Sequence, residues 1–329
     1  MDSTLQEVAE QIAASQRPLL IGHVRGDVDC VGSLAAMALA LRDVGKQPTV
    51  AIQRILIPPR LLGLYDWAGV TPVEKPDVAA SDLIVVLDTA VASRLNIACG
   101  IKGLADRPIA TIDHHITNER FGRWDLVDVE ASSTCELVLD LLTHLNWPIS
   151  PMVATLLYAG IHGDTDGFSL ANTSAGALEA ASRLAAAGAR IAEVCQRVDR
   201  SQTRSEFDLR RLIYDNTRVS EDGRVAWSTA SYEDIASTGC NHADIDDQVA
   251  VPRSLEGAQI AILFSEGIPG SVRINIRGEG DVDILSLAKE FGGGGHRSAA
   301  GTSIKNQPFA QVVEQVVARA VTYLAERDA

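Results

Sequence analysis

Short apolar runs alternate with helix-forming stretches along the first half of the 329-residue chain. Residues 34–44 are predicted to form a helix, with Ser33 as its N-cap and Gly45 as its stop. Four runs are rich in Val, Ile and Leu and short enough to be buried strands, at residues 18–24, 48–52, 83–87 and 109–112. This alternation predicts an α/β fold, in which a parallel sheet carries helices on both faces.

The pattern changes after two helical stretches, at residues 136–145 and 175–188, which flank an apolar segment at 153–161. Residues 191–218 are polar and arginine-rich and lack the composition of a flexible linker, so we predict a helical connector there. Three strands and a terminal amphipathic helix are predicted beyond it, at residues 225–231, 259–264, 271–277 and 309–324. We therefore expect one domain at 1–190, the connector, and a smaller α/β domain at 219–329 across a cleft.

The composition is that of a soluble globular protein. Hydrophobic residues make up 46% of the chain and charged residues 22%, and no apolar run approaches the roughly 18 residues that cross a bilayer. The N-terminal residues are acidic and polar, unlike a secretory signal, so we expect a cytoplasmic protein. Five widely spaced cysteines without a Cys-x-x-Cys pair predict reduced thiols. A net charge of −14 disfavours binding to long duplex nucleic acid, which needs clustered cations.

Ionisable residues follow three of the predicted strands. The carboxyl ends of parallel strands meet at one edge of a sheet, so these side chains are expected to converge. His23, Asp27 and Asp29 lie at the end of the first predicted strand or just after it. The two aspartates are two positions apart, so in an extended segment they would point to the same side and could serve neighbouring metal ions. The same loop, rich in Asp and Gly, could equally be a helix-capping turn.

The other two strand ends carry Asp88 and the run Asp113-His114-His115. Asp88 follows a strongly apolar strand, and a single carboxylate can bridge two cations through its two oxygens. Asp164 comes after the apolar segment 153–161, which could return it to the same edge. These carboxylates and imidazoles form a donor set without cysteine, which suits Mn²⁺ or Mg²⁺ better than structural zinc. Two such ions about 3.5–4 Å apart can hold the attacking and leaving oxygens of a phosphoryl displacement.

The second predicted domain carries four consecutive glycines, Gly292 to Gly295, followed at once by His296. Without Cβ atoms, the N–H groups of such a run can approach a phosphate or a base closely. Arg273 and Arg277 lie on a predicted neighbouring strand and add positive charge to an acidic chain. We therefore predict a substrate-binding loop here.

In this order the motifs resemble those of the DHH phosphoesterase superfamily, namely His23-x3-Asp27-x-Asp29, Asp88, Asp113-His114-His115 and Asp164. The sequence GGGGH resembles the DHH-associated C-terminal domain of the nanoRNase and pAp-phosphatase group. The resemblance covers nearly the whole chain. It implies a Mn²⁺-dependent phosphodiesterase or phosphatase that hydrolyses short oligoribonucleotides, 3′-phosphoadenosine 5′-phosphate (pAp) or both. It implies no membrane partner, and a homodimer is one assembly that it allows.

The resemblance also assigns roles to individual residues. Two divalent ions, Mn²⁺ in preference to Mg²⁺, would share Asp88 as a bridging ligand. The remaining ligands would be His23 and Asp27 for one ion, and Asp29, His114 and Asp164 for the other. His115 would contact the scissile phosphate while Asp113 orients the histidines. The far nucleotide would be held by Arg277, Gly293, Gly294, Gly295 and His296.

The sequence departs from the family pattern after the apolar segment. Residues 163–166 are Gly-Asp-Thr-Asp where the family favours Thr-Asp-Thr-Gly, so Asp166 and the nearby His162 add ionisable groups that we expect near the metals. Two other functions are compatible with the motifs: a cyclic-di-AMP or linear dinucleotide phosphodiesterase, and a catalytically inactive nucleotide-binding regulator. Inorganic pyrophosphatases share the first-domain motifs, but the GGGGH loop argues against that class.

Overall fold

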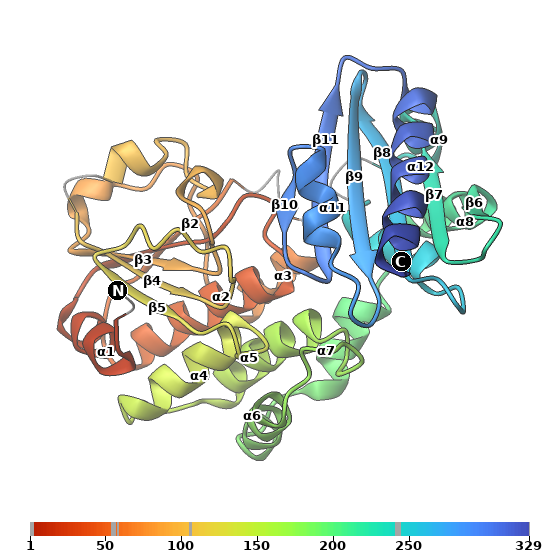
Figure 1. The fold of residues 1–329 in the computed structure, drawn as a ribbon. Coiled ribbons are helices and arrows are strands. Elements are labelled where there is room, and N and C mark those ends of the chain that lie inside the picture. The colour runs from red at the N-terminus through yellow and green to blue at the C-terminus, as the bar shows by residue number, and fades with distance from the viewer. Residues whose placement is uncertain (1–2, 54–56, 58, 105–106, 241–244, 329) are drawn as a thin grey trace. The chain divides into compact units, whose positions relative to one another are not determined.

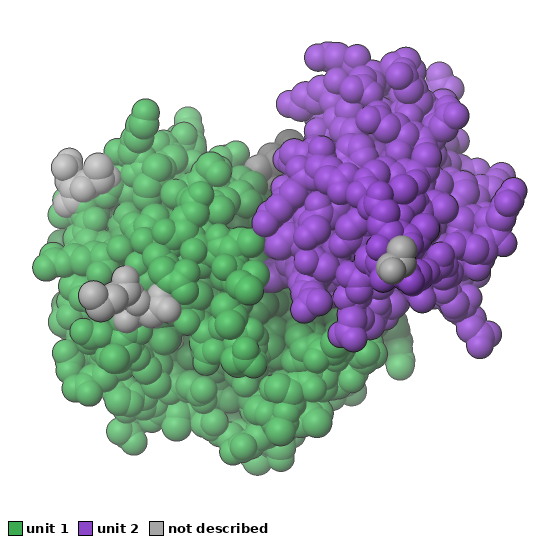
Figure 2. Space-filling model, viewed as in Figure 1, with its two compact units in different colours: residues 1–201 green, residues 202–329 purple. Residues whose placement is uncertain are grey.

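The computed structural model describes residues 3–53, 57, 59–104, 107–240 and 245–328, and the chain forms two compact units, residues 1–201 and 202–329 (Figure 2). The predicted connector, residues 191–218, contributes a helix to each unit. Helix α7 (Ile191–Asp199) packs on the preceding helices of the first unit, and α8 (Arg204–Asp215) packs on the second. Across the described ranges, no helix has the length and apolar character that a membrane crossing requires.

A five-stranded parallel sheet forms the centre of the first unit and confirms the predicted α/β class (Figure 1). In spatial order its strands are β2 (Thr49–Ala51), β1 (Pro18–Ile21), β3 (Leu83–Leu87), β4 (Ile109–Asp113) and β5 (Trp124–Val127). The first four match the predicted runs, whereas β5 was not predicted. Every residue of β1, β3 and β4 is buried, because both faces of the sheet are covered.

Helices cover one face of this sheet in two layers (Figure 1). Both α2 (Val28–Asp43) and α4 (Thr134–His144) contact the strands, and α5 (Pro151–Asp164) packs on these two helices. The unit also contains α1 (Leu5–Ala14), α3 (Pro59–Trp67) and α6 (Ala175–Ala186). The opposite face buries a smaller apolar cluster, including Ile84 and Val86, under a segment with the short 3₁₀ helices η3 (Ala92–Arg94) and η4 (Ile101–Leu104). A third 3₁₀ helix, η2 (Val78–Ala80), precedes β3.

Helix α2 begins at Val28, so the prediction of a start at Leu34 with Ser33 as N-cap is wrong. Asp27 is the N-cap, and its Oδ1 accepts the N–H of Cys30 at 3.1 Å. Asp27 and Asp29 therefore occupy a cap and a first helical turn rather than an extended segment. Glycine is more typical of loops than of helices, but Gly32 lies inside this helix. A Cβ there would lie 2.8 Å from the carbonyl oxygen of Leu156, so the glycine allows α2 and α5 to approach closely.

The second unit is a six-stranded mixed sheet in the order β10-β11-β9-β8-β7-β6, in which only β7 and β8 are parallel. Its strands are β6 (Thr217–Val219), β7 (Val225–Ala230), β8 (Ile260–Ile268), β9 (Ser271–Gly278), β10 (Gly294–Gly295) and β11 (Ala299–Lys305). One face packs on α11 (Ile284–Glu290) and α12 (Phe309–Asp328). The other packs on α8, α9 (Tyr232–Thr238) and the segment with η6 (Asp246–Val249) and α10 (Ala250–Arg253).

Candidate metal centre and nucleotide-binding loop

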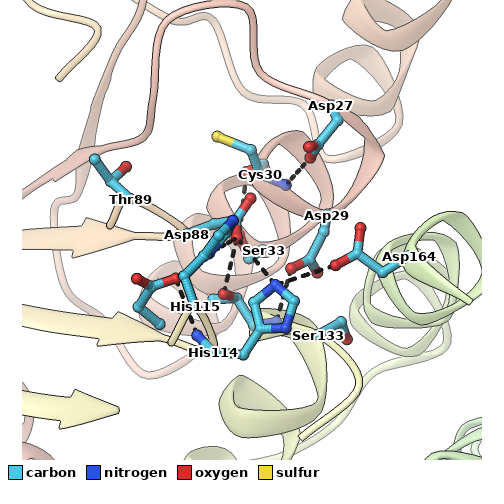
Figure 3. Close-up of polar contacts among 12 residues, drawn as sticks. Asp27, Asp29, Cys30, Ser33, Asp88, Thr89, His114, His115, Ser133 and Asp164 are labelled. Atoms are coloured by element: carbon cyan, nitrogen blue, oxygen red, sulfur yellow. Dashed lines mark hydrogen bonds and ion pairs between the residues drawn. The ribbon is translucent and has the colours of Figure 1, made fainter. Parts of the chain in front are cut away.

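Asp88 lies at the centre of the polar cluster at the carboxyl edge of the parallel sheet (Figure 3). Its Oδ2 is 3.3 Å from Nε2 of His23, which follows β1. Its Oδ1 is 3.6 Å from Nε2 of His114 and 3.6 Å from Nδ1 of His115, which both follow β4. The backbone of Asp88 is left-handed, with φ +54°, so the chain turns sharply where β3 ends. The structure thus brings the three predicted strand ends together around one carboxylate.

The other predicted ligands form two groups on either side of Asp88. Asp27 approaches His23, with 3.6 Å between Oδ2 and Nε2. Asp164, the last residue of α5, points toward His114 in Figure 3, with 3.2 Å between Oδ2 and Nε2. Asp29 joins this second pair, because its carboxylate lies within 4.8 Å of the donor atoms of both partners. All six predicted metal ligands therefore lie in one cluster, divided as two ions sharing Asp88 would need.

The backbone of α4 holds Asp29 in place. Its Oδ2 accepts the N–H of Thr134 at 2.7 Å, and its Oδ1 accepts the N–H of Cys135 at 2.9 Å. Both amides belong to the first turn of α4, where N–H groups lack partners within the helix and favour a negative charge. The hydroxyl of Thr134 also donates to Asp88 Oδ1 at 3.2 Å. These contacts were not predicted from the sequence, although the cap Ser133 and Glu136, three residues on, mark the helix start.

His23 is oriented by contacts at Nδ1. This atom lies 2.9 Å from the carbonyl oxygen of Val24, at hydrogen-bond distance, and 3.3 Å from Nη2 of Arg94. The other ring nitrogen, Nε2, faces Asp27 and Asp88. A metal-binding histidine is commonly oriented by such a bond.

Asp113 organises the residues behind the cluster. Its Oδ1 accepts hydrogen bonds from Nδ1 of His115 at 2.7 Å and from the N–H of His114 at 2.9 Å. Its Oδ2 accepts the side-chain amide of Asn118 at 2.6 Å. Asp113 is completely buried, so these bonds satisfy a carboxylate that has no access to water. The structure therefore places Asp113 where it can orient both histidines.

Burial and crowded charge shift the pKa values of the cluster. Burial, reinforced by the charge of Asp88, raises the pKa of Asp29 well above its ordinary value. The pKa of Asp164 rises to about 6, because burial outweighs its hydrogen bond to His114. Burial by itself would lower the histidine pKa values, but neighbouring carboxylates outweigh it and raise the pKa of His114 well above normal. Carboxylates crowded in this way need protons or cations beside them.

Cys30 also reaches the cluster, although the predicted donor set contained no cysteine. Its sulfur lies within 4.8 Å of donor atoms of His23 and Asp88. Burial raises the pKa of the Cys30 thiol above its ordinary value, which keeps the sulfur protonated. One buried thiol therefore lies beside the predicted oxygen and imidazole donors.

In the second unit, the predicted substrate residues lie at one end of the sheet. Arg277 of β9 pairs in register with Ala299 of β11, and the carbonyl of Ala299 accepts the N–H of His296 at 2.7 Å. Two of the glycines have packing roles. A Cβ at Gly293 or at Gly295 would lie 2.5 Å from a carbonyl oxygen of β11, whereas a Cβ at Gly294 would meet nothing within 4 Å among the described residues. Among the three glycines predicted to bind substrate, Gly294 is therefore the one whose described surroundings leave room for a ligand.

Asn275 was not predicted, although alternation along β9 places it between Arg273 and Arg277 on one face of the strand. It is 8% exposed, and among the described residues its amide nitrogen has no hydrogen-bond partner. In register beside it on β11 is Gly301, which has no side chain. A buried donor without a partner in a cationic strand face is a candidate ligand contact.

His162 does not join the strand-end cluster, contrary to our expectation. Its Nε2 lies 2.9 Å from Oδ2 of Asp199, on α7. Asp166 is exposed, in the turn that follows α5, with a left-handed backbone at φ +47°. His162 therefore lies against α7 rather than beside the predicted metal ligands.

Comparison with known proteins gives matches to both units. Residues 18–161 match the N-terminal domain of the DHH family, and residues 229–326 match the DHHA1 domain. A bifunctional oligoribonuclease and PAP phosphatase NrnA of Thermus thermophilus is 32% identical over 315 residues, covering 94% of this chain and 91% of that protein. A Bacillus subtilis protein of the same name is 28% identical, covering 91% and 92%. A cyclic-di-AMP phosphodiesterase GdpP of Geobacillus thermodenitrificans is 27% identical, over 93% of this chain and 47% of that protein.

Solved structures show the same fold. An exopolyphosphatase-related protein from Bacteroides fragilis superimposes with a TM-score of 0.85 at 22% identity, covering 96% of this chain and 95% of that one. The exonuclease RecJ of Thermus thermophilus in complex with Mn²⁺ has a TM-score of 0.54 at 16% identity, covering 97% and 55%. The chain therefore belongs to the DHH family of phosphoesterases, in the group that joins a DHH domain to a DHHA1 domain.

Proposed function

We propose that this protein is a Mn²⁺-dependent phosphoesterase that hydrolyses short oligoribonucleotides and pAp. The observation that carries the proposal is the cluster around Asp88, in which His23 approaches one carboxylate oxygen and His114 and His115 the other. The relatives named bifunctional oligoribonuclease and PAP phosphatase, aligned over more than nine-tenths of both chains, support this substrate class. Four cysteines of this chain, Cys30, Cys99, Cys135 and Cys195, are free thiols, which is typical of the reducing cytoplasm.

The residues of the cluster fit two divalent cations. Carboxylate oxygens and imidazole nitrogens are the donors that Mn²⁺ accepts. Burial and then neighbouring carboxylates raise the pKa values of Asp29 and Asp164, and a bound cation would favour their ionised forms. His23, Asp27 and Asp88 would hold one ion; Asp29, Asp88, His114 and Asp164 would hold the other. When bound, such ions polarise the phosphate and lower the pKa of water.

His115 is the residue that we assign to the substrate phosphate. Burial alone would lower the pKa of its imidazole, but the hydrogen bond to Asp113 and the charge of Asp88 outweigh burial and raise it. A raised pKa favours the protonated form of the ring. Its Nδ1 donates to Asp113, so Nε2 is the atom that would donate to a phosphate oxygen as negative charge grows there. Asp113 fixes the orientation of that ring.

The second unit would hold the nucleotide that is remote from the scissile bond. Arg277 supplies a guanidinium for phosphate, and Gly294 leaves its backbone accessible. His296 follows the glycines on the same turn, and Asn275 adds an amide donor from the neighbouring strand. Such a set suits a single nucleotide, which favours short substrates over long ones.

Three substrates assayed side by side test the proposal: a short RNA such as a trinucleotide, pAp, and cyclic-di-AMP, each with Mn²⁺ and with a chelator. We expect release of mononucleotides from the RNA and of phosphate from pAp, both abolished by the chelator. Preference for cyclic-di-AMP would replace the proposal with the function named for GdpP. Tight nucleotide binding without turnover would instead identify an inactive regulator.

Substitution of Asp88 tests the assignment of the site. Asp88→Asn should lower kcat more than about 100-fold, beyond the loss typical of residues that merely orient ligands. The matched control is Asp140→Asn on the exposed side of α4, where the carboxylate only pairs with Arg183. Circular dichroism should show that both variants are folded. Turnover retained in Asp88→Asn would overturn the assignment.

A further inference from the structure

A second cluster of metal-binding residues lies between α5 and α7, two helices that pack against each other. Tyr158 and His162 are four residues apart on α5, and Cys195 and Asp199 are four residues apart on α7. Residues at this spacing lie on the same face of a helix. The two pairs therefore face each other, and none of the four belongs to the cluster around Asp88.

The donor atoms of this cluster converge. His162 Nε2 lies 2.9 Å from Oδ2 and 3.2 Å from Oδ1 of Asp199. The sulfur of Cys195, a ring nitrogen of His162 and a carboxylate oxygen of Asp199 all lie within 4.8 Å of one another. In tetrahedral zinc sites, ligand distances of about 2.0–2.3 Å place neighbouring donor atoms about 3.4–3.6 Å apart. Small side-chain rotations would bring the three atoms to that spacing.

The surroundings resemble those of a metal site with an open coordination position. His162 is 7% exposed, and its ring stacks on Tyr158 with centroids 5.8 Å apart. Within the described part of the chain, its Nδ1 is buried without a hydrogen-bond partner. The side chain of Asp199 is 44% exposed, which leaves a route for an ion and for water. Burial, and then the charges of Cys195 and Asp199, raise the pKa of Tyr158.

We propose that His162, Cys195 and Asp199 form a third metal site, which takes Zn²⁺ or a similar borderline-soft cation. One imidazole, one thiolate and one carboxylate make a mixed donor set that zinc accepts and that Mn²⁺ and Mg²⁺ disfavour. Water completes the tetrahedron on the exposed side. The site differs from the catalytic cluster in its sulfur ligand and in sharing no residue with it.

A nucleophilic cysteine is the competing chemistry for these three residues. In a Cys-His-Asp arrangement the imidazole lies between the other two groups, bonding the carboxylate with one nitrogen and the thiol with the other. Here Nε2 bonds Asp199, and Nδ1 has no partner in the described chain. One donor atom from each of the three residues instead lies within 4.8 Å of the other two, as a shared metal ion would require.

An occupied site would tie α7 to the C-terminal turn of α5. His162 and Asp164 lie in the same last turn, so the ion would restrain the helix end that carries a predicted catalytic ligand. An ion that binds the folded chain but not the unfolded chain also raises the free energy of unfolding, by RT ln(1 + [Zn²⁺]/Kd). The site is thus structural rather than catalytic.

Cobalt spectroscopy of the full-length, Mn²⁺-loaded protein tests the proposal, because a thiolate bound to Co²⁺ gives a charge-transfer band in the near ultraviolet. We expect the band in the wild type and in Cys30→Ser, and its loss in Cys195→Ser. The Cys30 variant is the matched control, since that thiol lies beside the catalytic cluster. A band that survives in Cys195→Ser, or no band in the wild type, would overturn the proposal.

Alkylation provides an independent readout that does not depend on the folding of a variant. Zn²⁺ at about ten times its Kd should slow alkylation of Cys195 about tenfold, because only the unliganded fraction reacts. Cys99 is exposed, and its rate should not change. Mass spectrometry of the two peptides measures both rates in one sample. Equal rates at Cys195 with and without Zn²⁺ would contradict the proposed site.

Discussion

The side-chain amide of Asn118 contacts the candidate centre through Asp113, whose Oδ2 accepts it at 2.6 Å. Removal of that donor leaves a buried carboxylate oxygen unpaired and frees Asp113 to turn away from His115. We expect Asn118→Ala to lower kcat for pAp by roughly 10–100-fold, with little change in KM, because residues that orient a catalytic group act at this level. Steady-state kinetics at saturating Mn²⁺ measure the effect.

Asn216→Ala is a suitable control for this variant, because the amide of Asn216 bonds a backbone carbonyl of the second unit, that of Thr229. Its kcat should match that of the wild type. An Asn118→Ala enzyme with unchanged kcat would show that Asp113 is positioned without Asn118.

At the residue scale, the sequence predicted the charged side chains but not the groups that hold them. Asp88 and His114 were predictable because they follow apolar strands and carry donor atoms of recognisable chemistry. The amides of Thr134 and Cys135, which hold Asp29, could not be predicted in the same way. Every residue except proline has a backbone N–H, so the type of residue at a position does not reveal whether its N–H bonds a carboxylate.

At the scale of elements, strands were predicted better than helix boundaries. Strand β3 matches its predicted range because a short apolar run between polar residues has few alternatives. Helix α2 lacks a polar face, since it is buried between the sheet and α5, and its first two turns contain Asp29 and Gly32. Both residue types are typical of loops, and tertiary packing overrides that preference here.

Asp82 joins the turn after α1 to the start of β3. Its carboxylate accepts hydrogen bonds from the hydroxyl of Ser15 and from the N–H groups of Gln16 and Arg17. Partial burial would raise its pKa, but these bonds outweigh burial and lower it. A carboxyl group whose pKa is lower in the folded state than in the unfolded state stabilises the fold at pH values above its unfolded pKa of about 3.9. This stabilisation is lost as the pH falls toward the pKa of the folded state.

We therefore expect Asp82→Asn to lower the free energy of unfolding by about 0.5–1.5 kcal/mol at pH 7, the contribution of a typical hydrogen bond. The difference from the wild type should shrink as the pH falls below about 4. Urea denaturation at several pH values gives both quantities. A difference that stays constant down to the lowest pH would show that the charge of Asp82 is unimportant.

At the scale of the whole molecule, the division into two α/β units was predicted, but the second sheet was predicted only in part. Three of its strands, β7, β8 and β9, are long enough to show a pattern. The strands that escaped prediction are β6, β10 and β11, of which two are very short. Strand β11 is built largely from small residues, because it lies beside the glycine loop, where bulk would block the backbone.

The two units should contribute separably to catalysis, and Gly294 allows this to be tested. Gly294→Ala adds a methyl group that meets no atom of the described chain within 4 Å, so the variant should fold normally. We expect KM for a short RNA to rise about tenfold, equivalent to ~1.4 kcal/mol of binding, with little change in kcat. A simple diester without a second nucleoside, bis-p-nitrophenyl phosphate, should be hydrolysed as by the wild type.

Gly293→Ala provides the contrast, because its methyl group would lie 2.5 Å from the carbonyl oxygen of Gly301 and should lower the Tm. An unchanged KM for RNA in Gly294→Ala would show that the loop does not contact the far nucleotide. Loss of activity on the simple diester would show instead that the loop serves the reaction centre.

The hold of α4 on Asp29 has an evolutionary consequence. Both hydrogen bonds come from main-chain N–H groups, so neither depends on which side chain occupies position 134 or 135. Mutational drift at these positions can alter the neighbours of the carboxylate without releasing it, and proline is the one residue that removes the donor. The position of Asp29 therefore depends on the presence of α4 rather than on a sequence motif at positions 134 and 135. Related sequences can differ widely at these positions and still hold the carboxylate.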